Sequence, residues 1–399
     1  MHPLERYLKD LRTARSSGNT VAELSGYPVL RELLNTVGKD LSPEVYCVMN
    51  LGDSGAGLPD GGLFTADQLQ DGPDDPIQGI GPARGAIEVK APDAETDATA
   101  NSEQVQKYAR RYGLVLVTNY RDFKLVQHFQ DGPPVELDRF TLAPSAEGFW
   151  ALADHPRKAA NEQGALFVDF LQRVLTTGAP LARPEDLAWL LASFARESLA
   201  RVTAADSGLE SLSTVRKALQ ETLGVEFQGD EGEHFFESTL IQTLFYGVFS
   251  AWVLWARENP PGTPGAFNWH ETWWYLRVPL IRTLFTQMTS GRHLEALQLD
   301  DLLDRAGRAL NRVDRATFFE AFREEHAVQY FYEPFLQAYD PDLRKELGVW
   351  YTPPEVVEYM VRRVDRALQE ELGIDDGLAD PNVYVLDPCC WRRPPPAIP

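Results

Sequence analysis

Residues 87–90, with the sequence Ile-Glu-Val-Lys, alternate apolar and charged side chains. Alternate residues of a β-strand share a face, so Glu88 and Lys90 are predicted to project together while the apolar pair enters the core. Upstream, residues 58–62 (Leu-Pro-Asp-Gly-Gly) place the carboxylate of Asp60 in a glycine-flanked turn. If folding brings Asp60 beside Glu88, two carboxylates and a lysine form a site suited to a hard cation and an activated water.

Composition limits the class of protein. The chain has 399 residues and 44% apolar composition, enough for at least two cores, because single domains usually stop growing at roughly 250 residues. Its net charge of -21 argues against a uniformly basic nucleic-acid surface but allows a local basic groove. The three cysteines are too few for a disulfide framework or a four-cysteine zinc site, so a cytoplasmic location is expected.

The sequence gives no sign of a membrane segment. The N-terminus carries charges where a signal peptide has an apolar run. The longest apolar stretch, residues 240–255, is interrupted by Gln, Thr, Gly and Ser. It is shorter than the roughly 20 residues that span a bilayer, so it predicts a buried helix and no membrane partner.

Hydrophobic periodicity divides the chain into three parts. Residues 1–140 are predicted to form an α/β domain with a mixed central sheet flanked by helices. Residues 141–345 are predicted to form an all-α connector. Residues 346–399 change again, with a predicted helix over 355–372 and a predicted strand over 383–387 that ends in an acid.

By itself, an acid and a lysine two residues apart are a weak signal, because an ordinary surface ion pair contributes at most about 1 kcal/mol. The surrounding set strengthens it: an acid in a glycine loop, an apolar strand, and then a predicted helix that begins near Ser102. Hydrolysis of a phosphodiester at neutral pH needs a Lewis acid, and magnesium held by carboxylates can act as one. A neighbouring lysine can stabilise the developing charge.

Pro59-Asp60 together with Glu88-Val89-Lys90 resembles the motif of the PD-(D/E)xK nuclease family. The resemblance implies a nuclease-like fold in which Asp60 and Glu88 bind magnesium and Lys90 assists the attacking water. It implies DNA as the partner. A degenerate nuclease-like fold without activity is the alternative at this point.

Residues 104–108 (Gln-Val-Gln-Lys-Tyr) resemble the QxxxY helix motif of the restriction-enzyme and helicase-associated branches of that family. The resemblance implies that Gln104 and Tyr108 support the site or touch the phosphate. The family commonly adds an acid from its first helices. Glu23 is our candidate for this acid, with Glu32 second.

The C-terminal part resembles another family. Residues 347–368 resemble the segment that opens the core of adenine-specific N6 DNA methyltransferases, and residues 383–390 resemble the strand that begins its next motif. The resemblance implies the remnant of an S-adenosylmethionine site, made of Tyr351, Thr352, Pro353 and Asp387. The sequence departs from the family after Cys390, because the expected glycines and the later Asn/Asp-Pro-Pro-Tyr/Phe motif are missing. The latter motif holds the flipped adenine, so methyl transfer is not expected.

The order of nuclease, helical connector and methyltransferase start resembles type IIG and single-polypeptide type I restriction-modification enzymes. We therefore expect an N-terminal fragment, with S-adenosylmethionine bound only by the full-length parent and with the methyltransferase and target-recognition domains beyond residue 399. The proline-rich tail favours a frameshift. Two alternatives stay open: the catalytically incompetent front of an adenine DNA methyltransferase, or an inactive DNA-binding or assembly module.

Basic side chains accompany the predicted site. Lys107, Arg110 and Arg111 lie on the helix that carries residues 104–108. They are candidates for contact with DNA phosphates, and a solvated charged helix face is the equal alternative.

Overall fold

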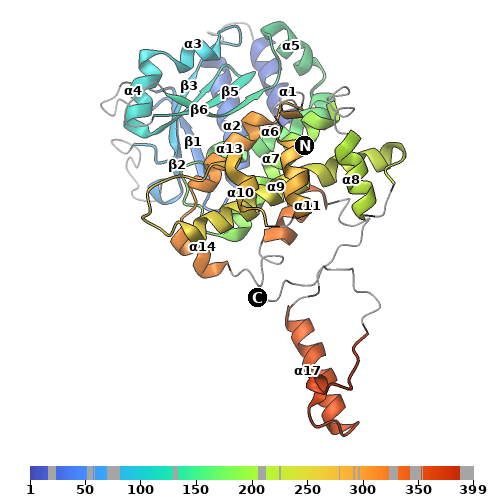
Figure 1. Cartoon of the computed structure of the whole chain (residues 1–399). Helices are drawn as coiled ribbons and strands as arrows, with labels where there is room; N and C mark the ends of the chain where they lie inside the picture. Colours follow the sequence, from blue (N-terminus) through green and yellow to red (C-terminus); the bar gives the residue numbers. More distant parts are fainter. Residues whose placement is uncertain are drawn as a thin grey trace. The chain divides into compact units, whose positions relative to one another are not determined.

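A computed structural model gives the fold of the chain (Figure 1). It describes residues 1–16, 24–51, 57, 59–69, 81–128, 134–204, 213–223, 226–277, 279–290, 293–294, 297–322, 331–341, 352 and 354–386. These residues belong to two compact units, Met1–Leu343 and Arg344–Pro399. The expected three-part division at residues 140 and 345 stays a prediction.

The first unit contains a six-stranded mixed sheet with its strands in sequential order. The strands are β1 (Val45–Met49), β2 (Gly61–Thr65), β3 (Gly85–Val89), β4 (Leu114–Thr118), β5 (Asp122–Gln127) and β6 (Val135–Thr141). β3 and β4 are parallel, and every other neighbouring pair is antiparallel. A parallel pair needs a crossover, and α3 (Thr96–Ala100) and α4 (Glu103–Tyr112) supply it. The expected mixed sheet flanked by helices is therefore present.

The two faces of the sheet bury different clusters. Ile87 and Val89 pack in a large core with α1 (Pro3–Ser16), α2 (Tyr27–Gly38) and the helices α5 (Ala146–Asp154) and α6 (Pro156–Thr176). On the other face, Ala86 packs with Val115, Val117 and the buried side of α4. The alternation predicted for residues 87–90 is thus observed, and Glu88 lies on the α4 face.

A second core lies among helices that follow the sheet. These are α7 (Pro184–Ala204), α8 (Ser213–Leu223), α9 (Gly229–Glu258), α10 (Thr272–Tyr275), α11 (Pro279–Met288), α13 (Asp300–Asn311), α14 (Arg315–Ala321) and α15 (Glu333–Tyr339). By length and composition alone, α9 could cross a membrane. Most of its apolar stretch is buried against other helices, including α7, α10 and α11, as expected for a core helix.

Three elements were not predicted: β6, α3 and α5. β6 follows a proline pair and alternates apolar and polar residues, so its sequence did carry a strand signal. The sequence of residues 270–288 predicts a single helix, and this prediction is wrong. The helical turns stop at Tyr275, Leu276 and Arg277 are not helical, and α11 starts at Pro279, a residue that fits a first turn but not a helix interior.

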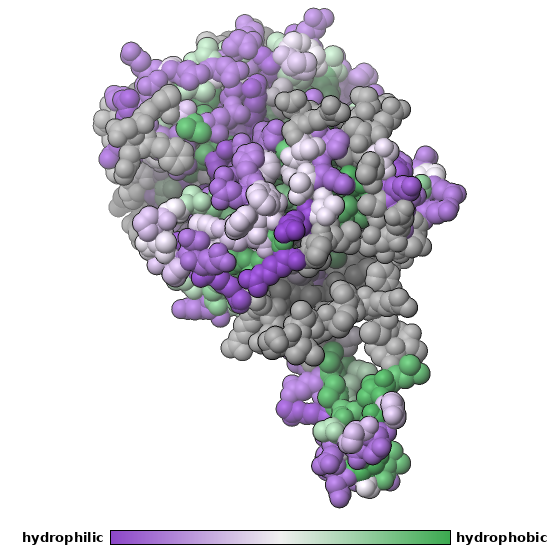
Figure 2. Space-filling model, in the orientation of Figure 1, coloured by the Kyte–Doolittle hydropathy of each residue, from purple (hydrophilic) through white to green (hydrophobic). Residues whose placement is uncertain are grey.

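The second unit contains α17 (Pro354–Glu370) and the short helix η7 (Gly377–Ala379), joined by a 2.7 Å bond from the backbone amide of Leu378 to Asp365. The spacing of five apolar residues predicts a core face on this helix, but the structure leaves all five exposed, by 44% to 57%: Val356, Val357, Met360, Val361 and Val364. Apolar surface on this unit is visible in Figure 2.

The strand predicted over 383–387 is also wrong for its described residues. Residues 383–386 form no strand, and Tyr384 is 92% exposed. A strand needs a partner for its backbone groups, and the described part of this unit offers none. Asp387 lies outside the described residues.

Candidate functional site

The candidate site is built where β2 begins and β3 ends. Gly61 pairs with Ile87 in the antiparallel ladder, so the register extended by one residue sets Asp60 opposite Glu88. The Asp60 carboxylate accepts a 2.7 Å hydrogen bond from the backbone amide of Val89. The backbone carbonyl of Asp60 also accepts a 2.7 Å bond from the amide of Asn50. The turn is thereby tied to both neighbouring strands, and two carboxylates sit at one edge of the sheet.

Lys90 and Gln104 converge on the buried carboxylate of Glu88. Glu88 is 1% exposed, and its Oε1 accepts a 2.6 Å bond from Lys90 Nζ. Its Oε2 accepts a longer bond, of 3.4 Å, from Gln104 Nε2. The Lys90 side chain remains 34% exposed, so its ammonium group pairs with the buried Glu88 carboxylate and is also accessible to solvent.

Tyr108 is buried and is linked to the site through Gln104. Gln104 lies one helical turn earlier and donates a 2.9 Å hydrogen bond to the Tyr108 hydroxyl. Burial raises the pKa of Tyr108, and the negative charges of Glu88 and Asp60 raise it further against the opposing effect of the Gln104 bond. Both carboxylates therefore act electrostatically on this one hydroxyl. α4 starts at Glu103 because the Ser102 hydroxyl accepts a bond from Val105.

The site fits a magnesium ion in the type and number of its donors. Asp60 and Glu88 offer carboxylate oxygens, and magnesium in proteins typically takes one or two carboxylates and keeps several waters. Among the described residues, no group of three or more His, Cys, Asp or Glu side chains is placed to hold a metal. Any metal here is thus held by two carboxylates at most within this part of the chain.

The third acid predicted from the N-terminal helices is not settled by the structure. Glu23 lies outside the described residues. Glu32, the second candidate, is on the exposed side of α2 and pairs with Arg6 at 3.2 Å. The hydrogen bonds described above link neither residue to Asp60 or Glu88.

Of the four residues expected at a remnant S-adenosylmethionine site, the structure describes only Thr352, which is exposed. Tyr351, Pro353 and Asp387 lie outside the described residues. The assignment of this site stays a prediction.

Sequence reasoning missed a buried lysine on the same sheet face. Paired residues set Glu88, Val117 and Lys124 in one row across β3, β4 and β5. Lys124 is 1% exposed and forms an ion pair with Asp97 and a second, of 3.1 Å, with Glu136. Two strand spacings separate Lys124 from Glu88 by about 10 Å. The alternation of side chains along β5 is a signal that could have placed Lys124 on this face, but nothing local showed that it was buried.

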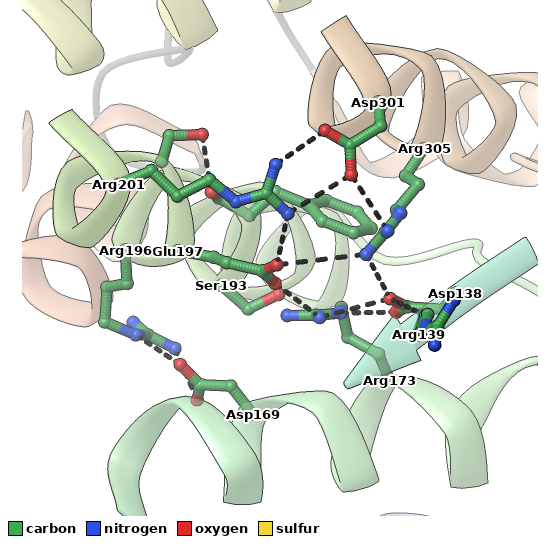
Figure 3. Close-up of polar contacts among 12 residues, drawn as sticks. Asp138, Arg139, Asp169, Arg173, Ser193, Arg196, Glu197, Arg201, Asp301 and Arg305 are labelled. Atoms are coloured by element: carbon green, nitrogen blue, oxygen red, sulfur yellow. Dashed lines mark hydrogen bonds and ion pairs between the residues drawn. The ribbon is translucent and has the colours of Figure 1, made fainter. Parts of the chain in front are cut away.

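A second polar cluster joins the sheet to the helices (Figure 3). Asp138 on β6 accepts bonds of 2.7 Å from Arg173 Nε and 2.6 Å from Arg305 Nη1. Arg173 also donates to Glu197, at 2.8 Å. Arg201 and Asp301 extend the cluster with a 2.6 Å ion pair. These residues come from β6, α6, α7 and α13, so one buried network connects the edge of the sheet with the helices that follow it.

Comparisons with known proteins give only a weak structural likeness. No protein-family model matches the chain, and no curated protein matches it. Among solved structures, it is similar to a chain in a cryo-EM structure of a DrdV–DNA complex, with 19% sequence identity and a TM-score of 0.33. The match covers 97% of this chain and 33% of that one, so the present chain spans a third of its length. A likeness this weak shows neither an activity nor a partner.

Proposed function

We propose that the sheet of the first unit carries a magnesium-dependent DNA endonuclease site of the PD-(D/E)xK kind. Asp60 and Glu88 would hold the metal, and Lys90 would assist the attacking water. The observation that supports this most is the register that sets Asp60 opposite Glu88, combined with the bond from Lys90 to Glu88. The two motifs, whose acids Asp60 and Glu88 have 27 residues between them in the sequence, thus meet where β2 begins and β3 ends.

Bound magnesium would neutralise phosphate charge and lower the pKa of a coordinated water. The side chains of the site have separate tasks. Glu88 is held by two donors, Lys90 and Gln104, and this fixes the direction of its oxygens. Lys90, whose side chain is partly exposed, would contact the scissile phosphate and stabilise the negative charge that develops on it. Gln104 and Tyr108 position Glu88 through their shared hydrogen bond.

The exposed face of α4 offers a route for the DNA backbone. Lys107, Arg110 and Arg111 are all exposed on the helix that carries Gln104. Lys107 and Arg111 lie three and seven residues after Gln104, so they share its side of the helix. The chain has a net charge of -21, so this basic strip is a local surface suited to binding the phosphates of DNA.

We further propose that the chain is part of a restriction-modification enzyme whose adenine N6 DNA methyltransferase and target-recognition domain are supplied by further sequence. S-adenosylmethionine would then be a cofactor of the complete protein only. The motif residues at 351–353 and 383–390, described above, support this proposal. Calorimetry with this chain should detect no binding of S-adenosylmethionine at micromolar concentration, and clear saturable binding would contradict it.

A plasmid-cleavage assay tests the endonuclease proposal. The purified chain with magnesium should nick or cut supercoiled DNA, and Lys90→Ala should lower the rate by about 100-fold or more, as removal of a charge-stabilising donor does elsewhere. Lys158→Ala is the matched control, because Lys158 is 73% exposed and pairs only loosely with Glu162, at 3.8 Å. Undiminished cutting by Lys90→Ala would remove the assigned site.

A further inference from the structure

An open cavity of about 270 Å³ lies where the start of α2 meets the end of β1. Its lining comes from the short helix η1 (Leu24–Gly26), from α2 and from the last residues of β1 and the position after it: Leu24, Tyr27, Pro28, Arg31, Met49 and Asn50. Among these described residues Arg31 alone is charged, and Leu24, Pro28 and Met49 are apolar. The cavity therefore combines an apolar lining with one guanidinium group.

The cavity adjoins the start of β2, the strand that follows Asp60. The backbone amide of Asn50 donates the 2.7 Å hydrogen bond to the carbonyl of Asp60. Met49 pairs with Gly61 in the antiparallel ladder, and a Cβ added to Gly61 would lie 2.6 Å from Met49 Sδ. Two lining residues thus contact either the candidate metal ligand or the residue after it. The cavity and the candidate metal site are therefore neighbours at one end of the sheet.

The walls of the cavity are held in place by contacts with the sheet. The side-chain amide of Asn35 forms hydrogen bonds of 2.7 and 3.3 Å with the backbone of Cys47, and these bonds fasten α2 to β1 (Figure 1). Arg31 lies one helical turn before Asn35, so it is on the same side of α2. The helix η1 is fixed as well, because the Tyr120 ring occupies the space that a Cβ on Gly26 would need. A cavity with fixed walls can select its occupant by shape.

The lining suits a small planar group that has a polar edge. Apolar side chains can cover the face of a ring, while Arg31 and Asn50 offer hydrogen-bond donors. Drug-sized ligands occupy cavities of roughly 300–1,000 Å³, so this smaller cavity fits a group of about the size of one nucleobase. Proteins bind unstacked bases in this way, against apolar or aromatic side chains and arginine guanidinium groups.

We infer that this cavity binds one unstacked base of the substrate DNA, with Arg31 donating to the edge of that base. This binding mode rests on the proposed endonuclease function, because the neighbouring metal site would hold the same DNA strand. Adjacent strands of the sheet lie about 5 Å apart, and nucleotides advance about 3.4 Å along a DNA helix. The bound base would therefore lie within about three nucleotides of the scissile phosphate.

The inference predicts a preference for DNA that already contains an unpaired base. Taking a base out of a duplex costs free energy, and the cost is least where the base is unpaired. The test compares a fluorescently labelled duplex that carries one bulged nucleotide with the same duplex fully paired. Binding is measured by anisotropy in EDTA, so that no cleavage occurs. The unsubstituted full chain should bind the bulged duplex about tenfold more tightly, as expected when one base stacks on protein side chains.

Two substitutions remove the binding site in different ways. Arg31→Gln removes the donor, and Leu24→Trp fills the cavity from a position that is 52% exposed while Arg31 is kept. Both variants should bind the two duplexes equally. Arg282→Gln is the matched control, because it removes the same charge from an exposed position on α11, and it should keep the preference.

Three outcomes would overturn the inference. The first is equal binding of both duplexes by the unsubstituted chain. The second is a preference that survives in Arg31→Gln or in Leu24→Trp. The third is an Arg31→Gln variant that weakens both duplexes by the same factor and so keeps their ratio, because Arg31 would then contact the DNA backbone and not a base.

Failure of the cavity and failure of the endonuclease proposal give different results. Lys90→Ala should lose cleavage in magnesium but keep the preference for the bulged duplex in EDTA. If the unsubstituted chain prefers the bulged duplex but does not cut DNA in magnesium, the endonuclease proposal fails and the cavity is still a base-binding site. If the chain cuts DNA but binds both duplexes equally, the cavity inference fails and the endonuclease proposal stands.

Discussion

The carboxylate of Asp60 accepts a 2.7 Å hydrogen bond from the backbone amide of Val89, the residue between Glu88 and Lys90. This single bond connects the turn before β2 with the end of β3. It gives Asp60 a structural task in addition to the proposed metal binding, and the two tasks can be separated by substitution.

Asp60→Asn and Asp60→Ala should differ in stability but not in activity. Asparagine keeps an oxygen that can accept from the Val89 amide, whereas alanine leaves that buried donor without a partner, at a cost of about 1–3 kcal/mol. Both substitutions remove the charge, so both should abolish magnesium-dependent cleavage. Urea unfolding measures the first effect and the plasmid assay the second. An equal loss of stability in both variants would show that the bond contributes little.

Tyr108→Phe should weaken metal binding while preserving the fold. The ring is 1% exposed and packed, and only the hydroxyl that accepts from Gln104 is removed. Loss of a group that orients a metal ligand typically lowers metal affinity by about 10–100-fold. Calorimetry with magnesium measures this effect. Tyr46→Phe is the control, because the Tyr46 hydroxyl bonds Glu44 on the surface, away from the site. Equal affinity in all three proteins would mean that Tyr108 has only a packing role.

Asp138→Asn should strongly destabilise the first unit. Asp138 is 5% exposed and accepts from Arg173 and Arg305, so neutralising it leaves two buried guanidinium groups without their shared partner. Breaking a buried ion pair in this way costs about 3–5 kcal/mol. Chemical denaturation gives the value. A loss below about 1 kcal/mol would indicate that water or Glu197 compensates the charge.

Stability should fall in acid through Asp97 and Asp301. The hydrogen bond from Lys124 holds the pKa of Asp97 below its usual value. Burial raises the pKa of Asp301, but the bond and charge of Arg201 outweigh burial and lower it overall. A lowered folded-state pKa stabilises above the unfolded pKa of about 3.9, and this stability is lost as the pH falls through the lower folded value.

The measurement is the urea midpoint at a series of pH values from 7 downward. The midpoint should decline below about pH 4, where the carboxylates take up protons. Asp301→Asn should show a shallower decline, since one of the two linked groups is gone. A decline of the same steepness would assign the acid sensitivity to other carboxylates.

Local sequence determined the centre of the sheet well. Residues 45–49 and 114–118 are short apolar runs of strand-forming residues, and these runs predict strands with the observed bounds. The convergence of Asp60 and Glu88 was also predictable, since a glycine turn and one antiparallel pairing bring them together. Here the resemblance to a nuclease motif and the strand alternation pointed to the same residues.

The contacts that sequence reasoning missed are those between distant segments. Asp138 and Arg305 are separated by 167 positions, and no local pattern indicates that they meet. Likewise, apolar spacing predicted that α17 had a buried face, but the described part of its unit does not cover Met360. Periodicity identifies a face suited to packing, and only the tertiary structure shows whether a partner covers it.

The central claim is that Asp60 and Glu88 together bind a divalent metal, and a manganese-soaked crystal of this chain tests it most directly. Manganese takes the same oxygen ligands as magnesium and is located by anomalous scattering. We predict one anomalous peak within bonding distance of both carboxylates, absent in crystals of Glu88→Gln. A well-ordered site with no peak there, or a peak that persists in Glu88→Gln, would contradict the account.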